Sequence, residues 1–285
     1  MAVSCRTDHK SDWLRMKADK IESILKPDEK YTVQNRALCF LPGDRLPRLS
    51  AGQGFLGKIQ DVMKRHGRIY YTLVYLFGPV LSSRRHRKRL KKLLAGYDVK
   101  DIILNLGSGP TYLLNRKDVI NVDIFAFDEV DIVVDATNLQ IKDESVDCII
   151  NIAMMEHVPY PEKVFSEMRR ILREGGQIFC YLPFMAPFHA APDDFYRWSH
   201  SGARAVFSDF KEVDVFMGSG PASGFLWVFQ EWLSVLLSFG SKTLHDILFL
   251  TLMLLTWPIK LLDFFMVKLP CAVNIASGFC VVVRK

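Results

Sequence analysis

Short apolar runs, separated by stretches in which helices fit, occupy the middle of the chain and strongly restrict its possible folds. A buried strand followed by a helix and a further strand is the repeating unit of a parallel sheet, because parallel neighbours need a long crossover connection. We therefore predict an α/β fold in which a mostly parallel sheet carries helices on both faces. The predicted strands are residues 101–106, 119–122, 132–134, 146–152 and 177–182.

The first of these runs ends in a glycine turn, Gly107-Ser108-Gly109-Pro110. Glycine lets the backbone approach a ligand that a Cβ atom would exclude, and this turn is where doubly wound sheets bind nucleotides. A GxG sequence alone has little specificity, since many strand-to-helix turns use glycine. Asp123 at the end of the second run and Asp135 after the third strengthen the prediction, because acids at strand ends hydrogen-bond ribose hydroxyls in such folds.

Five longer segments follow one another in a characteristic order: ILNLGSGP, VINVDIF, VVDATNLQIKDESVDCIINIAMMEHV, EMRRILREGGQIFCYLPF and HAAPDDFYRWSHSGARAVFSDF. In this order they resemble the class I S-adenosylmethionine-dependent methyltransferases, and especially the bacterial methyltransferase type 11 group. The resemblance covers residues 98–217, and the final IASGFCVVVRK is similar to the ends of some members. It implies a Rossmann-like sheet of seven strands, the last antiparallel, with S-adenosylmethionine bound over the carboxyl ends of the first strands.

The resemblance also implies cofactor contacts. Gly107 and Gly109 would approach the methionine part of the cofactor, and Asp123 would hold the ribose hydroxyls. Asp135 and Ala136 would contact the adenine, and Met155, after the fourth strand, would lie beside the methyl group. Two positions depart from the family pattern, since Asn105 replaces an acid and Thr111 replaces a third glycine, which lowers the expected cofactor affinity. The predicted cofactor-binding residues are Asn105, Gly107, Ser108, Gly109, Asp123, Asp135, Ala136 and Met155.

A loop bounded by prolines follows the fifth predicted strand and gathers polar and aromatic groups suited to acceptor binding. Methyl transfer from a sulfonium is an in-line displacement that depends mainly on positioning, so we expect no metal ion. A hydroxyl acceptor also benefits from a base that removes its proton, and histidine is the commonest choice. The predicted catalytic residues are His189, His157 and Asp193, and the predicted acceptor contacts are Glu156, Tyr196, Arg197 and Trp198. The alternative is that these groups only cap helices and pack.

The net charge of +6 comes from one short segment. Without it, the chain has 30 basic residues (37 less 7) against 31 acidic ones, which disfavours a wide nucleic-acid-binding surface. Residues 70–77, which are rich in aromatic side chains, come shortly before this basic segment. Clustered cations next to aromatic residues are typical of binding to an anionic membrane surface. A solvated helix face remains the alternative. The seven cations are Arg84, Arg85, Arg87, Lys88, Arg89, Lys91 and Lys92.

The last part of the chain is unusually apolar. Residues 247–259 carry no charge, but this run is shorter than the roughly 20 residues that a membrane span needs. A second apolar stretch, residues 225–237, precedes it, and Gly240-Ser241 separates the two. We predict a helical hairpin that lies in or on a membrane without spanning it. The alternative is that the hairpin covers the sheet or closes a dimer interface.

Six scattered cysteines show no CxxC pair and indicate neither a zinc site nor a disulfide framework, so we expect a reducing compartment. The N-terminal residues lack the apolar core of a signal peptide, which favours the cytoplasm. Four parts are expected along the chain. They are an N-terminal extension (1–55), an amphipathic and basic helical segment (56–97), the methyltransferase core (98–217), and an apolar helical hairpin with the final strand (218–285).

We accordingly predict an enzyme at the cytoplasmic face of a membrane that uses S-adenosylmethionine to methylate a hydroxyl of a glycan or lipid-linked acceptor. One alternative is a methyltransferase for a small molecule such as a quinone or secondary metabolite, with the apolar tail forming its pocket. A second is a cofactor-binding scaffold that no longer catalyses, because Asn105 and Thr111 depart from the family pattern.

Overall fold

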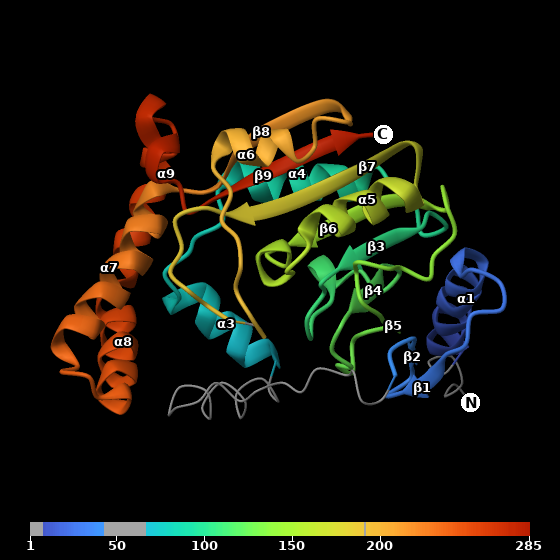
Figure 1. Cartoon of the computed structure of the whole chain (residues 1–285), viewed down its shortest axis with the longest axis horizontal. Helices are drawn as coiled ribbons and strands as arrows, with labels where there is room; N and C mark the ends of the chain where they lie inside the picture. The colour runs from blue at the N-terminus through green and yellow to red at the C-terminus, as the bar shows by residue number, and fades with distance from the viewer. Residues whose placement is uncertain (1–7, 43–66, 191) are drawn as a thin grey trace, which may run out of the picture.

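The computed structural model describes residues 8–42, 67–190 and 192–285. Within these residues one sheet contains β1 (Thr32–Gln34), β2 (Ala37–Cys39), β3 (Ile103–Leu106), β4 (Ile120–Asp123), β5 (Ile132–Val133), β6 (Val146–Ile152), β7 (Leu172–Pro183), β8 (Lys211–Ser219) and β9 (Gly278–Arg284). Their order across the sheet is β1-β2-β5-β4-β3-β6-β7-β9-β8 (Figure 1).

The pairing confirms the predicted α/β fold. Strand β3 runs parallel to β4 and β6, and the parallel region extends to β5 on one side and β7 on the other. The final strand, β9, is antiparallel to both of its neighbours, β7 and β8. The chain's last residues therefore complete the sheet, as the resemblance implied.

The prediction of seven strands was wrong, because the described residues form a sheet of nine. The two additional strands form a hairpin, β1–β2, whose turn residues Asn35 and Arg36 both have positive φ. Strand β2 then pairs in parallel with β5 and places Leu38 opposite Ile132. Strands of three residues are too short to show an alternating pattern, so their long-range pairing is not readable from the sequence.

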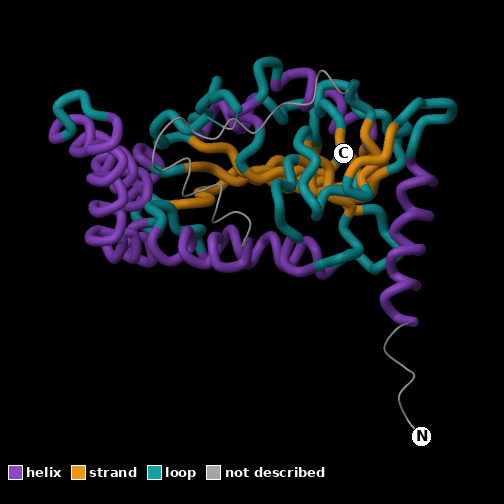
Figure 2. The backbone as a smooth tube through the Cα atoms, turned by 90° about the horizontal axis from the view of Figure 1, so that it is seen from below, coloured by secondary structure: helices purple, strands orange, loops and turns teal. Residues whose placement is uncertain are grey.

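Helices cover both faces of the sheet, which lies between them in Figure 2. The helices are α1 (Asp8–Ile24), α3 (Gly67–Phe77), α4 (Arg84–Ala95), α5 (Pro161–Ile171), α6 (His200–Ala205), α7 (Pro221–Leu237), α8 (Lys242–Thr256) and α9 (Asp263–Met266). Shorter 3₁₀ turns are η2 (Leu113–Asn115), η3 (Met155–His157), η4 (Trp257–Leu262) and η5 (Pro270–Ile275).

The hydrophobic core has a cluster on each face of the sheet, because successive side chains of a strand point to opposite faces of the sheet. On one face, Leu104 of β3 belongs to a cluster with side chains from α1, α5 and α6. On the other face, Ile103 of β3 and Phe179 of β7 pack with Leu90 and Leu94 of α4. The strands therefore read as continuous apolar runs, since both of their faces are buried.

The predicted apolar hairpin is formed by α7 and α8, with Gly240 in the left-handed region at the connection. The first turn of α7 is joined to α9 through a carboxylate at the beginning of α9. Asp263 Oδ1 accepts a hydrogen bond from the Ala222 backbone N–H (2.7 Å), and Oδ2 accepts from the Ser223 backbone N–H (3.0 Å) and hydroxyl (2.6 Å). One buried acid thus caps the first turn of α7, a helix without an N-cap side chain of its own.

A buried lysine forms a second polar connection. Lys260 Nζ in η4 donates hydrogen bonds to the carbonyl oxygens of Tyr75 and Gly78 (both 2.7 Å), at the end of α3. Burial lowers the pKa of Lys260 to about 8. The ring of Phe77 also packs edge-on against Trp257, with centroids 6.0 Å apart. Helix α3, which lies ahead of the basic segment in sequence, therefore packs against the chain after the hairpin.

Replacing the capping acid, Asp263→Ala, is expected to lower the free energy of unfolding by about 1–3 kcal/mol, because buried backbone donors of α7 lose their acceptor. Chemical denaturation of the purified protein measures this change. The matched control is Asp209→Ala, since the side chain of Asp209 is exposed. Equal stability of the two variants would show that the carboxylate of Asp263 does not secure the hairpin.

Candidate active site

Three of the predicted cofactor segments meet at the carboxyl ends of the parallel strands. Gly107 and Gly109 follow β3, and both have positive φ (+73° and +57°). The glycine loop is fixed by Asp123 at the end of β4, whose Oδ2 accepts a hydrogen bond from the Gly109 backbone N–H (2.8 Å). Its Oδ1 accepts from the Phe125 backbone N–H (3.0 Å). The acid predicted to hold the ribose therefore also holds the loop.

The electrostatics of Asp123 follow from its position. Burial raises the pKa of its carboxyl above the ordinary value, although the backbone N–H donors around it oppose that shift. Asp135, after β5, accepts hydrogen bonds on Oδ1 from the backbone N–H (2.8 Å) and hydroxyl (2.7 Å) of Thr137. This closes a local turn in which Ala136 is half-buried. Both acids lie at strand ends, and each retains further acceptor capacity for a ligand.

Two predicted contacts belong to the interior. Asn105 lies opposite Asn121 in the pairing of β3 with β4, and its side-chain amide donates to Asn121 Oδ1 (3.2 Å). Met155 is fully buried in the main core. Its neighbour Met154 instead lies directly over Gly107, where a Cβ atom would come within 2.5 Å of Met154 Cγ. Met154 thus contacts the glycine loop, which no spacing in the sequence signalled.

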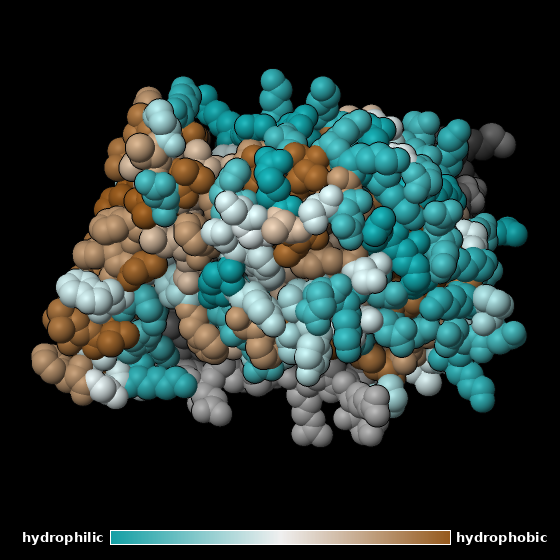
Figure 3. Space-filling model, turned by 45° about the horizontal axis from the view of Figure 1, so that its top comes forward, coloured by the Kyte–Doolittle hydropathy of each residue, from teal (hydrophilic) through white to brown (hydrophobic). Residues whose placement is uncertain are grey.

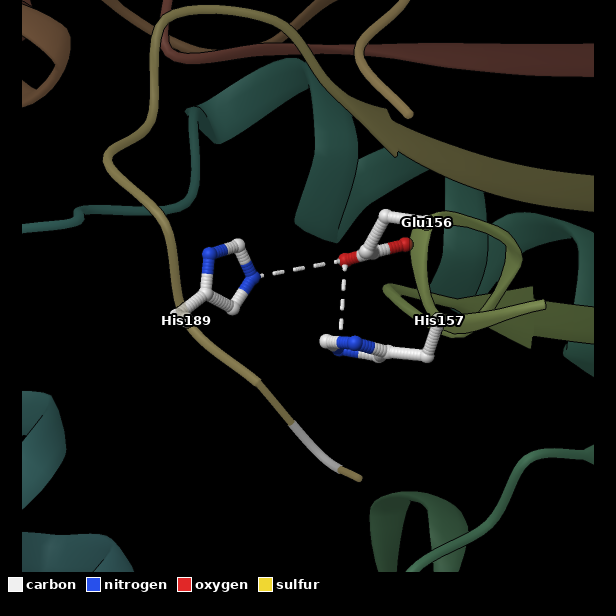
Figure 4. Close-up of side chains that lie close together, drawn as sticks. All are labelled: Glu156, His157 and His189. Atoms are coloured by element: carbon white, nitrogen blue, oxygen red, sulfur yellow. Dashed lines mark ion pairs between the residues drawn. The ribbon is translucent and has the colours of Figure 1, made fainter. Parts of the chain in front are cut away.

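The segment after β6 carries backbone strain and a group of titratable side chains. Ala153 adopts a positive φ (52°), and such strain in a residue other than glycine is concentrated at functional sites. In the following turn, η3, the Glu156 carboxylate is completely buried. Its Oε1 lies 3.7 Å from His189 Nε2 and 3.9 Å from His157 Nε2 (Figure 4). The structure therefore brings both predicted histidines together around one predicted acceptor contact.

The loop that carries His189 is held by an ion pair. Arg197 Nη1 and Nη2 donate to the two carboxylate oxygens of Asp194 (2.5 and 2.6 Å), and Asp194 Oδ2 also accepts from the His189 backbone N–H (2.7 Å). Burial would raise the pKa of the Asp194 carboxyl, but Arg197 and the backbone donor outweigh that effect and hold it at about 2. The other N–H groups of Arg197 donate to the carbonyls of Ala186, Pro187 and Tyr196.

The remaining predicted residues of the loop have different surroundings. Asp193 is exposed, and its backbone carbonyl contacts His157 Nδ1 at 2.6 Å. Tyr196 is exposed and donates to the carbonyl of Pro159 (3.1 Å), while the Trp198 ring is buried. The Phe195 backbone N–H donates to the Glu156 carbonyl (2.7 Å), so the loop is attached directly to η3.

A residue of the apolar hairpin also reaches this site. The ring of Trp227 on α7 lies 5.0 Å from the ring of His189, centroid to centroid. Sequence analysis missed this contact, because Trp227 lies in an apolar stretch with no polar motif. The packing of α7 thus places the hairpin directly beside the histidine cluster.

Part of the chain is similar to a known domain family. A protein-family model described as "Methyltransferase domain" matches residues 110–180, from the last residue of the glycine turn to within β7. None of the curated proteins matches the chain.

Several solved structures are similar. Phosphoethanolamine N-methyltransferase 2 of Haemonchus contortus, solved with phosphomonomethylethanolamine and S-adenosylhomocysteine, is 15% identical with a TM-score of 0.47. The similarity covers 79% of this chain and 60% of that one, so the chain spans less than two thirds of that enzyme. A methyltransferase of Archaeoglobus fulgidus is 16% identical with a TM-score of 0.45, and 76% and 99% of the two chains are covered. The family model thus covers about a quarter of the chain, and the matched segment, residues 110–180, is similar to a methyltransferase domain.

Proposed function

We propose that the chain is a class I S-adenosylmethionine-dependent methyltransferase that transfers the methyl group of S-adenosylmethionine to a hydroxyl of a glycan or lipid-linked acceptor at the cytoplasmic face of a membrane. Residues 98–217 form the catalytic core in this proposal, and residues 218–285 supply the membrane-facing hairpin and the final strand. The observation that carries it is the contact of Trp227 with His189, which places the candidate active site beside an exposed apolar hairpin.

The strand ends supply the cofactor site of the proposal. Gly107 and Gly109 leave space for the methionine part, and Asp123 has acceptor capacity for the ribose hydroxyls. Asp135 and Ala136 lie one strand further, where the adenine would be bound. Met154 covers Gly107, so we add it to the residues beside the methionine part.

The histidine cluster supplies acceptor activation. Burial lowers the pKa of His189, but the Glu156 carboxylate and the Pro187 carbonyl outweigh that effect, so its pKa lies above the ordinary value. A raised pKa makes the imidazole a stronger base, which favours its acceptance of a proton from a hydroxyl as the methyl group transfers. The proposal therefore assigns the loss of the acceptor's proton to this cluster, with His189 in contact with the acceptor.

Two substitutions are expected to separate cofactor binding from turnover. Asp123→Asn weakens the affinity for S-adenosylmethionine about tenfold or more, because it removes charge-assisted hydrogen bonds. His189→Ala lowers the turnover number about 10²–10⁴-fold while cofactor affinity stays within about twofold. Calorimetric titration and methyl-transfer assays measure the two effects, with His200→Ala as the control. Unchanged turnover of His189→Ala would exclude His189 from acceptor activation.

The hairpin has the polarity of a surface that faces lipid. Polar side chains of α7, Ser223, Gln230 and Ser234, are buried against the protein. The exposed side chains of the hairpin and of the adjoining α9 are mostly apolar, with Trp232 of α7 58% and Phe265 of α9 72% exposed. Figure 3 shows the corresponding brown surface on the left, where α7, α8 and α9 lie in Figure 1. Apolar patches of this extent on a water-soluble surface usually mark an interaction site.

A monotopic or peripheral position fits the hairpin better than a full span. The continuous helical segment Lys242–Met266 is long and apolar enough to cross a membrane by length and composition. However, Lys260 and Asp263 near its end are buried in contacts with α3 and α7. The apolar part available to lipid is therefore shorter than the segment, and we propose that it lies in the interface.

The basic helix α4 lies close to the same surface. The guanidinium of Arg84 is 5.0 Å from the centroid of the Phe264 ring in α9, so the cations begin beside the hairpin. Arg85 and Arg89 are engaged by Asp214 of β8, whereas Lys88, Lys91 and Lys92 are exposed. Each exposed cation close to an anionic membrane contributes roughly 1 kcal/mol to binding.

The free thiols support the cytoplasmic side of the proposal. Cys39, Cys148, Cys180 and Cys280 are buried and unpaired among the described residues. Burial raises the pKa of Cys180 and Cys280 well above the ordinary value, which keeps both protonated and unreactive. The fold therefore depends on no disulfide between described cysteines, which suits a reducing compartment.

Vesicle flotation tests the membrane part. The purified chain is expected to bind vesicles that contain anionic lipid, and Trp232→Glu and Phe265→Glu each weaken that binding about tenfold or more, because a large apolar side chain contributes about 1.5–3 kcal/mol when buried. The control is Val99→Glu, since Val99 is comparably exposed (52%) but lies outside the hairpin. Equal binding by all three variants, or no binding by the parent chain, would contradict membrane association.

Mass spectrometry of lipid and glycan fractions, from cells with and without the protein, tests the acceptor class. The proposal expects a species in one of these fractions whose mass differs by one added methyl group. A difference confined to soluble small molecules would favour a quinone or secondary-metabolite acceptor. Cofactor binding without transfer to any fraction would favour a scaffold.

A further inference from the structure

The cluster around Glu156 has an unusual excess of acceptor atoms. Both carboxylate oxygens of Glu156 are buried, and neither accepts a hydrogen bond within the described part of the chain. A buried carboxylate without partners is unfavourable by several kcal/mol unless a charge or a proton compensates for it. The structure therefore leaves Glu156 in need of a positively charged partner.

The two histidines do not supply that partner as neutral rings. His157 Nδ1 lies 2.6 Å from the Asp193 carbonyl, and His189 Nδ1 lies 2.8 Å from the Pro187 carbonyl. A carbonyl oxygen only accepts hydrogen bonds, so each Nδ1 carries the proton and each Nε2 presents a lone pair. Both lone pairs face Glu156 Oε1.

Arg197 does not alter this assignment, although its Nη2 lies 3.3 Å from His189 Nδ1. The two protons of Nη2 are donated to the carbonyl of Pro187 (2.7 Å) and to Asp194 Oδ2 (2.6 Å). No proton of Nη2 remains for the imidazole. His189 Nδ1 is therefore a donor, and three acceptor groups converge on one point.

We propose that Glu156, His157 and His189 bind a divalent transition-metal cation of the Zn²⁺ type at the carboxyl end of β6. One ligand atom from each residue lies within 4.8 Å of the other two. Ligands about 2.0–2.2 Å from a tetrahedral cation are about 3.4 Å apart, so the distances of 3.7 and 3.9 Å need to contract by only a few tenths of an ångström. Two imidazoles and one carboxylate are a ligand set that such cations prefer.

The surroundings are those of a constructed metal site. Histidine ligands commonly donate their second N–H to a backbone carbonyl, which orients the ring, and both histidines do so here. The Arg197–Asp194 pair fixes the loop of His189, and the Phe195 N–H fixes it to Glu156. The ligands are thus positioned before any cation binds.

Three protein ligands leave at least one position of the cation open. The role of the cation in catalysis rests on the proposed function, whereas its binding does not. An acceptor hydroxyl at the open position loses its proton to solvent more readily. The C–S bond of the sulfonium then breaks as the C–O bond forms, and the products are a methyl ether, S-adenosylhomocysteine and the released proton. His189 acts in this case as a ligand rather than as the base.

The test is a titration of the chelator-treated full-length protein with Zn²⁺, in competition with a chromophoric chelator. One equivalent is expected to bind, and Glu156→Gln and His157→Ala each weaken its affinity about tenfold or more. His245→Ala is the matched control, because His245 forms another histidine–acid pair, with Glu231 (3.0 Å). Retained affinity for S-adenosylmethionine shows that each variant is folded.

Equal Zn²⁺ affinity in the parent, Glu156→Gln and His157→Ala would overturn the cation site. If Zn²⁺ does not bind and His189→Ala still abolishes turnover, the cation site is excluded and the proposed function stands with His189 as the base. If Zn²⁺ binds at these residues but no membrane-linked acceptor is methylated, the cation site stands and the proposed acceptor class is wrong.

Discussion

Parallel pairing of β3 with both of its neighbours is the constraint on which the site depends. Leu106 lies opposite Val122 of β4 and Asn151 of β6, so three chain segments leave the sheet at the same level. The glycine loop, Asp123 and the turn after β6 are far apart in sequence and converge only through this register. The nearby loop of His189 follows β7, which is parallel to β6. A shift of one residue in β3 would exchange its two buried faces and misplace the loop.

The hairpin reverses the polarity of the rest of the chain. In the sheet, apolar side chains are inside, whereas in α7 the buried face includes Gln230 and Ser234 and the exposed face is apolar. Two of the buried polar side chains donate hydrogen bonds: Gln230 Nε2 donates to Thr256 Oγ1 (2.8 Å), and the Ser234 hydroxyl donates to the Gln230 carbonyl (2.7 Å). Gln230 Oε1 accepts none within the described part of the chain. In water, this arrangement leaves a large apolar surface exposed to solvent. A lipid interface would cover that surface.

The sequence predicted the parts of the fold that have strong local patterns. The long apolar runs correctly indicated β3, β4, β6 and β7, and the glycine pair marked the first strand-to-helix turn. The short strands β1, β2 and β5 join the sheet through pairing with distant residues, so the predicted number of strands in the sheet was too low. Within the site, the sequence does not distinguish neighbouring residues of the same type. Met154 rather than Met155 covers the glycine loop, and Asp194 rather than Asp193 pairs with Arg197. Neighbouring identical residues differ only in the direction of their side chains, which depends on tertiary packing.

The contact between His189 and Trp227 relates the chemistry to the apolar surface. Trp227 lies on α7 between Phe225 and Val228, which are both exposed. An α-helix with its side chains is about 10–12 Å wide, so the histidine cluster lies about one helix width from the surface proposed to contact lipid. Under the proposed function, a hydroxyl on a lipid headgroup would reach the cluster at that distance while its acyl chains stay in the membrane. The same arrangement disfavours an acceptor that is buried among the acyl chains, because it would have to leave the lipid to meet the methyl group.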